Sequence, residues 1–356
     1  MPYPTIEPPQ SVAPLLAAIY LACVIVNVFA AWRCGREGAR RSMILAYLAA
    51  AIAFVASCCS FAGSPPPLPG AVKALVDAVL GPGTIFLGAM TLLVVMDMGR
   101  RFVVLPAVAL LLLNGMVLLF GLSLTDPVFA TVAGRPDHVP IVAMIGLLAG
   151  FTWLATYQAV ENDRRLAAGK GPLEATYSAK VLTWPDLVYI ELIVTVALLA
   201  VLVAWSLLVP APLESPANPA VTPNPAKAPW YFLGLQEWLV YADAWFVGFV
   251  VPCLLVLGLM LIPYLDTSTE GSGYYAIRQR RGAYQAFMLA FFLLWILPIL
   301  VGTFMRGPNW SFFGPYEPRD PGRVSVQDNV SLSEYLWGRS LGHPQPRADG
   351  QSGVWR

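Results

Sequence analysis

Residues 192–208 read LIVTVALLAVLVAWSLL and contain no charged side chain. An apolar stretch close to 20 residues long is enough to cross the roughly 30 Å hydrocarbon core of a bilayer as a helix. The whole chain has this character, because 57% of its 356 residues are hydrophobic and only 12% are charged, whereas soluble proteins average about 25% charged residues. This composition excludes a soluble cytosolic enzyme, and a net charge of +1 gives no support to nucleic-acid binding.

Eight apolar stretches of this kind are bounded by polar or by Pro- and Gly-rich segments. The sequence therefore predicts an all-α, polytopic membrane bundle of about eight transmembrane helices. An even number of spans places both termini on the same side of the membrane. The predicted spans lie near residues 12–32, 43–62, 76–97, 102–122, 139–160, 186–208, 244–264 and 284–304.

The Lys and Arg residues are distributed unevenly between the two sets of loops. Only Lys73, Arg135 and Lys227 fall in the loops that follow even-numbered spans. Since cytoplasmic loops accumulate positive charge, this bias predicts that both termini lie on the outer, positive side of the membrane. The loops after spans 1, 3, 5 and 7 hold thirteen basic residues: Arg33, Arg36, Arg40, Arg41, Arg100, Arg101, Arg164, Arg165, Lys170, Lys180, Arg278, Arg280 and Arg281.

The connection between spans 6 and 7, about residues 209–243, differs from the other loops. It begins with a proline-rich stretch, which favours extended and turn structure. It continues as Trp230-Tyr231-Phe232-Leu233 and further apolar and aromatic residues. Because Trp and Tyr favour the membrane interface, this part predicts a short amphipathic helix at the outer interface. The tail from Arg306 onward is polar and rich in Pro and Gly, which predicts mostly irregular extramembrane chain.

Histidine is scarce, and this limits the redox chemistry of the chain. Haem b in a membrane bundle needs two histidines that project from facing helices. His138 lies at the outer mouth of span 5 and His343 lies in the tail, so we expect both to be solvated interfacial residues and this chain to hold no haem b. The five cysteines show no metal or haem spacing and are expected to pack in membrane helices. No metal site is predicted.

Few ionisable residues fall at membrane depth, where they are costly and therefore candidate functional groups. Asp97 stands beside Arg100 and Arg101 and is expected to form an interfacial ion pair. Asp186 follows Thr183 and Pro185 at the start of span 6, a pattern that is typical of helix capping. Glu191 lies about one and a half turns deeper. Capping cannot explain its position, but pairing with another helix could.

Three segments of the second half carry a resemblance to a known family. They are Thr183-Trp184-Pro185-Asp186-Leu187-Val188-Tyr189, the loop from Thr222 through Lys227-Ala228-Pro229-Trp230-Tyr231-Phe232 to Glu237, and Ile262-Pro263-Tyr264-Leu265-Asp266. Together they resemble the C-terminal domain of cytochrome b, called subunit IV where it is a separate protein. The end of the chain, from Gly302-Thr303-Phe304 to Gly314-Pro315-Tyr316-Glu317, is similar to the bacterial branch of this subunit.

The resemblance implies a function in quinol oxidation. Members of the family oxidise a quinol on the positive side, pass one electron to an iron–sulfur protein and the other through two haems b, and reduce quinone on the negative side. It further implies a quinol-binding loop at Lys227, Pro229, Trp230, Tyr231 and Phe232, and an inner quinone site near Asp186 and Glu191. The expected partners are a dihaem subunit like the N-terminal half of cytochrome b, a Rieske-type iron–sulfur protein, a c-type cytochrome and membrane lipids.

The chain departs from the family in its quinol-oxidation motif, Pro-Glu-Trp-Tyr. Aligning Trp230 and Tyr231 places Pro229 where the family has the glutamate that is thought to accept a proton from the quinol. Glu237 is eight residues downstream of Pro229, which in a helix means about 12 Å and about 80° of rotation. It cannot occupy the same place. Glu237 is therefore either an alternative proton acceptor or a structural residue.

The sequence predicts three regions and leaves several functions open. The regions are an N-terminal membrane bundle of four helices at 1–135, whose role cannot be predicted, a cytochrome b C-terminal-like domain at 136–305 and a polar tail at 306–356. The leading interpretation is a haem-free subunit of a bc-type quinol:cytochrome c oxidoreductase that is not catalytic alone. The alternatives are a scaffold subunit without quinol chemistry, a quinol-oxidising anchor of another multihaem complex, and a transporter, for which no internal repeat is visible.

Overall fold

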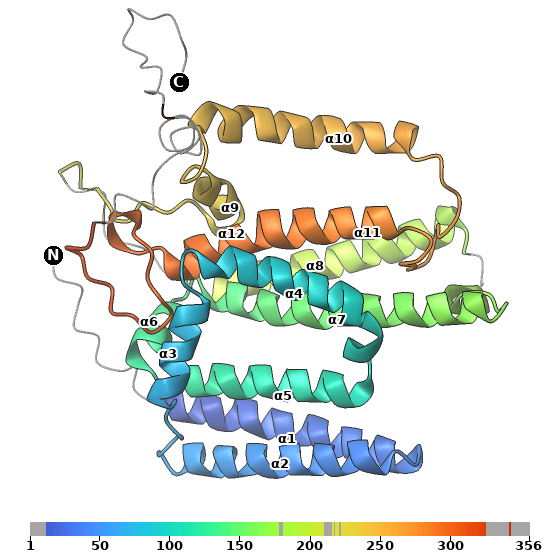
Figure 1. Ribbon diagram of the computed structural model, residues 1–356, viewed down its shortest axis with the longest axis horizontal. Helices are drawn as coiled ribbons and strands as arrows, with labels where there is room; N and C mark the ends of the chain where they lie inside the picture. The colour runs from blue at the N-terminus through green and yellow to red at the C-terminus, as the bar shows by residue number, and fades with distance from the viewer. Residues whose placement is uncertain are drawn as a thin grey trace, which may run out of the picture.

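The computed structural model describes residues 12–177, 181–209, 216, 218–220, 222–324 and 342. In these residues all regular elements are helical, apart from one isolated bridge between Arg306 and Phe312. The long helices run side by side along a common direction, and consecutive ones alternate in sense (Figure 1). The prediction of an all-α, polytopic helical bundle is confirmed.

Seven helical segments are long and apolar enough to cross a membrane, and a sharply bent pair of helices provides an eighth candidate. Short helices α6 (Pro127–Ala133) and α9 (Trp230–Trp238) lie between the spans. The seven segments are α1 (Val12–Arg36), α2 (Arg40–Phe61), α5 (Pro106–Ser123), α7 (Val139–Ala167), Thr183–Leu208 containing α8 (Val188–Leu208), Phe246–Leu265 containing α10 (Val251–Leu265), and Arg281–Met305 containing α11 (Arg281–Phe287) and α12 (Leu297–Leu300).

The third predicted span, 76–97, is not one straight helix. It is divided between α3 (Gly70–Val79) and α4 (Thr84–Val103), whose axes differ by 86°. The break falls at Gly81-Pro82-Gly83, where proline removes a backbone donor and glycine weakens a helix. The Thr84 hydroxyl donates to the carbonyl oxygens of Ala78, at 3.0 Å, and Gly81, at 3.2 Å. The bend is therefore held by local hydrogen bonds that the hydropathy pattern does not predict.

The arginine-rich turns gather at one end of the bundle. The α1–α2, α4–α5 and α10–α11 turns and the end of α7 all lie at the right-hand side of Figure 1, whereas α3, α6 and α9 lie toward the left. Arg100 Nη1 bonds to Asp97 Oδ1 at 2.8 Å, so the ion pair predicted for Asp97 is confirmed. At the same end, Asp163 accepts a hydrogen bond from the backbone N–H of Arg278. We call this the basic end and the opposite one the α9 end.

The N-terminal helices pack closely through small and polar residues. The α1–α2 contact buries alanines, and an amide pair joins α1 to α5. Asn27 donates to Asn114 Oδ1 at 2.7 Å, and Asn114 donates back to Asn27 Oδ1 at 2.9 Å. In a membrane, small residues let helices approach closely and side-chain amides link them. These contacts define a compact first half of the bundle.

The two halves of the chain meet through an apolar cluster. Ile85 at the start of α4 packs with Val301, Met305 and Phe312, from the end of the last span and the following tail. The tail itself is irregular, as expected, but Ser311 and Phe313 are fully buried. Tyr316 shares a hydrogen bond of 2.7 Å with Ser123 at the end of α5. The described part of the tail, up to residue 324, therefore closes the α9 end of the bundle.

Two spans lack this kind of packing. None of the residues of α8 or α10 is buried within the chain. Both are strongly apolar all round, with large side chains such as Leu202 and Leu257 more than half exposed. A helix that is apolar on every face is typical of one surrounded by lipid or by other helices. In this chain by itself, these two helices have almost no protein neighbours.

Candidate functional site

The candidate site is built around α9, the short helix at the end of the bundle opposite the basic turns. It begins directly after Pro229, and its inner face packs on the last span. A β-carbon at Gly234 would lie 3.0 Å from Ile299 Cγ1 and 3.2 Å from the Trp295 carbonyl oxygen, so this close approach needs glycine. The short helix predicted between spans 6 and 7 is therefore present.

The loop that leads into α9 is held by one amide side chain. Gln236 Oε1 accepts from the backbone N–H of Ala228 at 2.7 Å, and its Nε2 donates to the Ala226 carbonyl oxygen at 2.9 Å. A second link joins the loop to the tail, since Asn224 and Asn309 exchange hydrogen bonds of 2.8 and 2.7 Å. The sequence does not predict these Gln236 and Asn224–Asn309 contacts, because contacts between loop residues eight or more positions apart leave no repeating pattern in a sequence.

The aromatic residues Trp230, Tyr231 and Phe232 point away from the bundle. Their exposed fractions are 42%, 49% and 54%. The three rings contact one another, with centroids 5.7 Å apart for Trp230 and Tyr231 and 4.8 Å apart for Tyr231 and Phe232. They form an aromatic cluster at the α9 end that is free to meet lipid, a ligand or another protein.

Glu237 is completely buried, on the face of α9 that also buries Leu233 and Gly234. Its carboxylate accepts three N–H contacts from Arg306, the shortest being 2.7 Å from Nη2 to Oε1, and the Tyr241 hydroxyl donates at 2.8 Å. Burial lowers the pKa of Arg306, but hydrogen bonding to and charge attraction by Glu237 outweigh it and raise the pKa overall. In this arrangement Glu237 joins α9 to the end of the last span. Arg306, which immediately follows an apolar span, was missed as its partner.

Lys227 is half-buried beside the last turn of the same span. Its Nζ donates to the Thr303 carbonyl oxygen at 2.8 Å. Burial, followed by the positive charges of Arg319 and Arg135, lowers the pKa of Lys227 to about 7. An ammonium group with a pKa in this range can exchange a proton near neutral pH, which an ordinary surface lysine cannot.

His138 is buried rather than solvated, so that expectation was wrong. Its Nδ1 lies 2.6 Å from the Val132 carbonyl oxygen, and its ring packs edge-on against Phe304 with centroids 5.2 Å apart. Burial lowers the pKa of His138 despite the nearby carboxylate of Asp137. The end of the last span and α6 cover the start of α7, a tertiary contact that a sequence cannot show. His343 lies outside the described residues.

Asp186 and Glu191 lie at the start of span 6, far from α9 along the chain. Both are exposed, and within the described residues neither carboxylate has a hydrogen-bond or ion-pair partner. The helix start at Leu182 shows no side-chain capping bond, so the predicted capping by this Thr-Pro-Asp sequence is not seen. The pairing of Glu191 with another helix of this chain is also not seen, because α8 packs on none.

The described residues do not fit a haem or a metal ion. No group of three or more His, Cys, Asp or Glu side chains comes together in this part of the chain. The one described histidine, His138, faces a carbonyl oxygen and a phenyl ring. A b-type haem needs two facing imidazoles, and the part of the chain that the structure describes offers no such pair.

A comparison with protein families identifies the segment that contains this site. Residues 216–306 match the family model described as cytochrome b (C-terminal)/b6/petD. This segment is cytochrome b-like. It covers α9, the aromatic cluster, Lys227 and both partners of the Glu237–Arg306 pair, which confirms the resemblance stated from the sequence for this part of the chain. The match does not extend to the first four spans. No solved structure matches the chain.

Proposed function

We propose that the chain is a haem-free membrane subunit of a bc-type respiratory quinol:cytochrome c oxidoreductase, and that it forms part of the quinol oxidation pocket on the positive side. The single observation that carries this proposal is the cytochrome b match across 216–306. The arrangement of the helices supports it, because the matched loop and α9 lie opposite the basic turns (Figure 1). By the positive-inside rule, that end faces outward in a bacterial inner membrane.

The quinol would contact the loop and the first turn of α9. Pro229 and the aromatic residues Trp230, Tyr231 and Phe232 supply a wall, and their exposure leaves them available to a ligand ring. Lys227 supplies the nearby titratable group, with a pKa of about 7. Oxidation of a quinol releases two protons and two electrons, so a group that exchanges protons near neutral pH suits this position.

Glu237 is the candidate replacement for the missing motif glutamate. Its carboxylate is held by Arg306 and Tyr241, so accepting a proton from the quinol would require this cluster to open or a water chain to reach it. A carboxylate next to a guanidinium is a weak proton acceptor. This favours a structural role for Glu237 and leaves the quinol's protons to water or to Lys227.

The exposed faces of α8 and α10 support the proposal of partner subunits. We assign the haems b to a dihaem subunit like the N-terminal half of cytochrome b, and expect a Rieske-type iron–sulfur protein and a c-type cytochrome to complete the electron path. Asp186 and Glu191, exposed at the start of span 6, would then meet a quinone or a partner at the inner side. The remaining apolar surface would face membrane lipids.

A scaffold subunit without quinol chemistry is the second candidate. It is favoured by Pro229 in place of the motif glutamate and by the ion pair that occupies Glu237. In that case, the aromatic cluster would bind another subunit instead of a quinol. The two candidates differ in what happens when the cluster is altered in an assembled complex.

The test is to replace Tyr231 in the whole complex and to measure quinol:cytochrome c turnover. If Tyr231 is part of the pocket wall, we expect Tyr231→Ala to lower kcat/KM for quinol by about tenfold, equivalent to about 1.4 kcal/mol, while assembly is unchanged. Tyr264→Ala is the control, because Tyr264 is also an exposed tyrosine but lies near the C-terminal end of α10, away from α9. Normal turnover in the assembled Tyr231→Ala complex would favour the scaffold candidate.

A further inference from the structure

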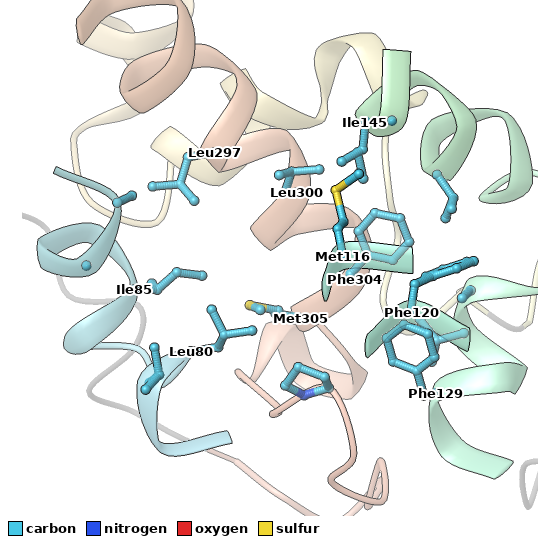
Figure 2. A pocket seen from close by; sticks show the side chains of 18 of the residues that line it. Leu80, Ile85, Met116, Phe120, Phe129, Ile145, Leu297, Leu300, Phe304 and Met305 are labelled. Atoms are coloured by element: carbon cyan, nitrogen blue, oxygen red, sulfur yellow. The ribbon is translucent and has the colours of Figure 1, made fainter. Parts of the chain in front are cut away.

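A cavity of about 630 Å³ lies between the two halves of the chain. One wall comes from α3, α4, α5 and α6, and the other from α7 and the last span. Figure 2 shows side chains from both walls around the same space, among them Leu80, Ile85, Phe129 and Phe304. The first of these two walls therefore belongs to the N-terminal part of the chain, which the cytochrome b match does not cover.

The lining is apolar throughout. None of the described residues that line the cavity carries a polar or charged side chain. Water enters a buried cavity only where it finds two or more polar partners, and apolar cavities that proteins keep empty are much smaller, about 150 Å³ in a well-known engineered case. An apolar space of this size inside a membrane is therefore suited to a hydrocarbon chain.

The cavity is closed at the α9 end and open deeper in the membrane. At the closed end, Pro315 of the tail lines it next to the buried residues Ile85 and Met305. At the deeper end, its lining includes Leu92 and Met116, which are 58% and 43% exposed. Leu92 lies eight residues after Thr84, the first residue of α4, which is about 12 Å along the helix axis. An opening at this depth lies in the hydrocarbon of the bilayer, where a phosphate head group is costly but a neutral quinol is not.

The closed end shares a wall with the candidate quinol loop. The Phe304 side chain lines the cavity, and the His138 ring packs against it from outside. The carbonyl oxygen of the preceding residue, Thr303, accepts the hydrogen bond from Lys227. One turn of the last span thus separates the apolar cavity from the half-buried Lys227 of the loop.

We propose that this cavity is a binding site for the isoprenoid tail of the quinol, whose ring lies against Phe304 at the closed end, one turn of the last span away from Lys227. The tail then runs along the cavity between the N-terminal spans and the last span, and leaves toward the bilayer between Leu92 and Met116. This inference rests on the proposed function, and it gives the N-terminal four spans a role, which is to complete the substrate site. A phospholipid chain or another segment of this protein in the cavity would contradict it.

Two glycines in the lining allow the cavity to be filled without disturbing its walls. A β-carbon on Gly88 of α4 or on Gly146 of α7 would meet no atom within 4 Å, and both positions line the cavity. Gly99 and Gly150 lie on the same two helices, are equally open and do not line the cavity. Gly88→Leu and Gly146→Leu are therefore the test variants, and Gly99→Leu and Gly150→Leu are their matched controls.

The experiment compares a long-tailed quinol with a quinol that has no isoprenoid tail, both oxidised by the whole complex. The tail leaves lipid that is as apolar as the cavity, so its binding gain comes from packing and is moderate. We expect Gly88→Leu and Gly146→Leu to raise KM for the long-tailed quinol about fivefold, with KM for the tail-less quinol and both control variants unchanged. Two independent positions keep the test valid if one variant does not assemble.

Solvent extraction of the washed complex provides the second measurement. We expect quinone to be retained by the wild type and by the controls and to be lost from the two test variants. Equal retention in all variants, equal changes in KM for both quinols, or loss of a phospholipid instead of quinone would overturn the inference. If the wild-type complex oxidises neither quinol, the proposed function itself fails, and this outcome is distinct from the others.

Discussion

At the scale of single residues, Lys227 combines an unusual environment with a position next to the aromatic cluster. It is the last cation before Pro229, which the sequence could show, and it is half-buried against Thr303, which the sequence could not. A loop lysine is normally solvated. Burial follows from the tail and the last span closing over the loop, and this tertiary contact joins residues 76 positions apart.

The lowered pKa of Lys227 predicts a pH dependence of stability. The ordinary pKa of lysine is about 10.4, so between pH 7 and pH 10 the unfolded chain binds a proton that the folded chain does not. The free energy of unfolding therefore rises with pH through this window, by up to about 1.4 kcal/mol per pH unit. We expect Lys227→Met to remove this rise in denaturant unfolding of the detergent-solubilised protein.

Lys170→Met is the control for this measurement, because Lys170 is exposed at the basic end. It should keep the wild-type pH dependence. The same slope in Lys227→Met as in the wild type would show that Lys227 titrates normally in the folded protein. Groups around Lys227, namely Arg319, Arg135, Asp137 and Glu237, contribute equally to both variants and cancel in the comparison.

At the scale of elements, α9 is fixed to the last span by its buried face. The sequence predicts the helix from its aromatic and apolar residues, but it leaves two roles open for Glu237. The structure places Glu237 on the inner face beside Arg306, 69 residues away. Its spacing from Pro229 shows only that it cannot occupy the motif glutamate's place. The identity of its partner depends on how the last span returns to α9, which no local pattern contains.

The Glu237–Arg306 pair predicts strong and coupled effects on stability. Removing one partner leaves a buried charge uncompensated, which costs about 3–5 kcal/mol. We expect Arg306→Met to destabilise the protein by about this amount, and Glu237→Leu with Arg306→Met to be less destabilising than the single change. A double-mutant cycle in thermal or denaturant unfolding measures the coupling.

The half-exposed pair Arg323–Glu317 in the tail is the matched control. A pair of this kind contributes about 0–1 kcal/mol, so Arg323→Met should have a small effect. If the effects at Glu237 and Arg306 simply add, the pair does not hold α9 to the last span. In that case, the alternative role of Glu237 as a proton acceptor gains support.

At the scale of the whole molecule, the sequence predicts the bundle and its two ends better than its internal packing. Hydropathy and charge place the spans and gather the arginines at one end. They miss the 86° bend between α3 and α4, because a hydropathy window averages over the break at Gly81–Gly83. They also miss the cavity between the halves, since it is formed by side chains of spans that are distant in sequence.

The exposed helices α8 and α10 and the scarcity of histidine lead to the central claim. We propose that this chain is a haem-free subunit and that its redox partner carries the haems b. The most direct measurement is the reduced-minus-oxidised spectrum of the gently purified complex, before and after the subunits are separated. We expect b-type haem absorbance in the complex, and we expect all of it to leave with a histidine-rich membrane partner. Haem absorbance that stays with this chain, or a complex that contains no haem protein, would contradict it.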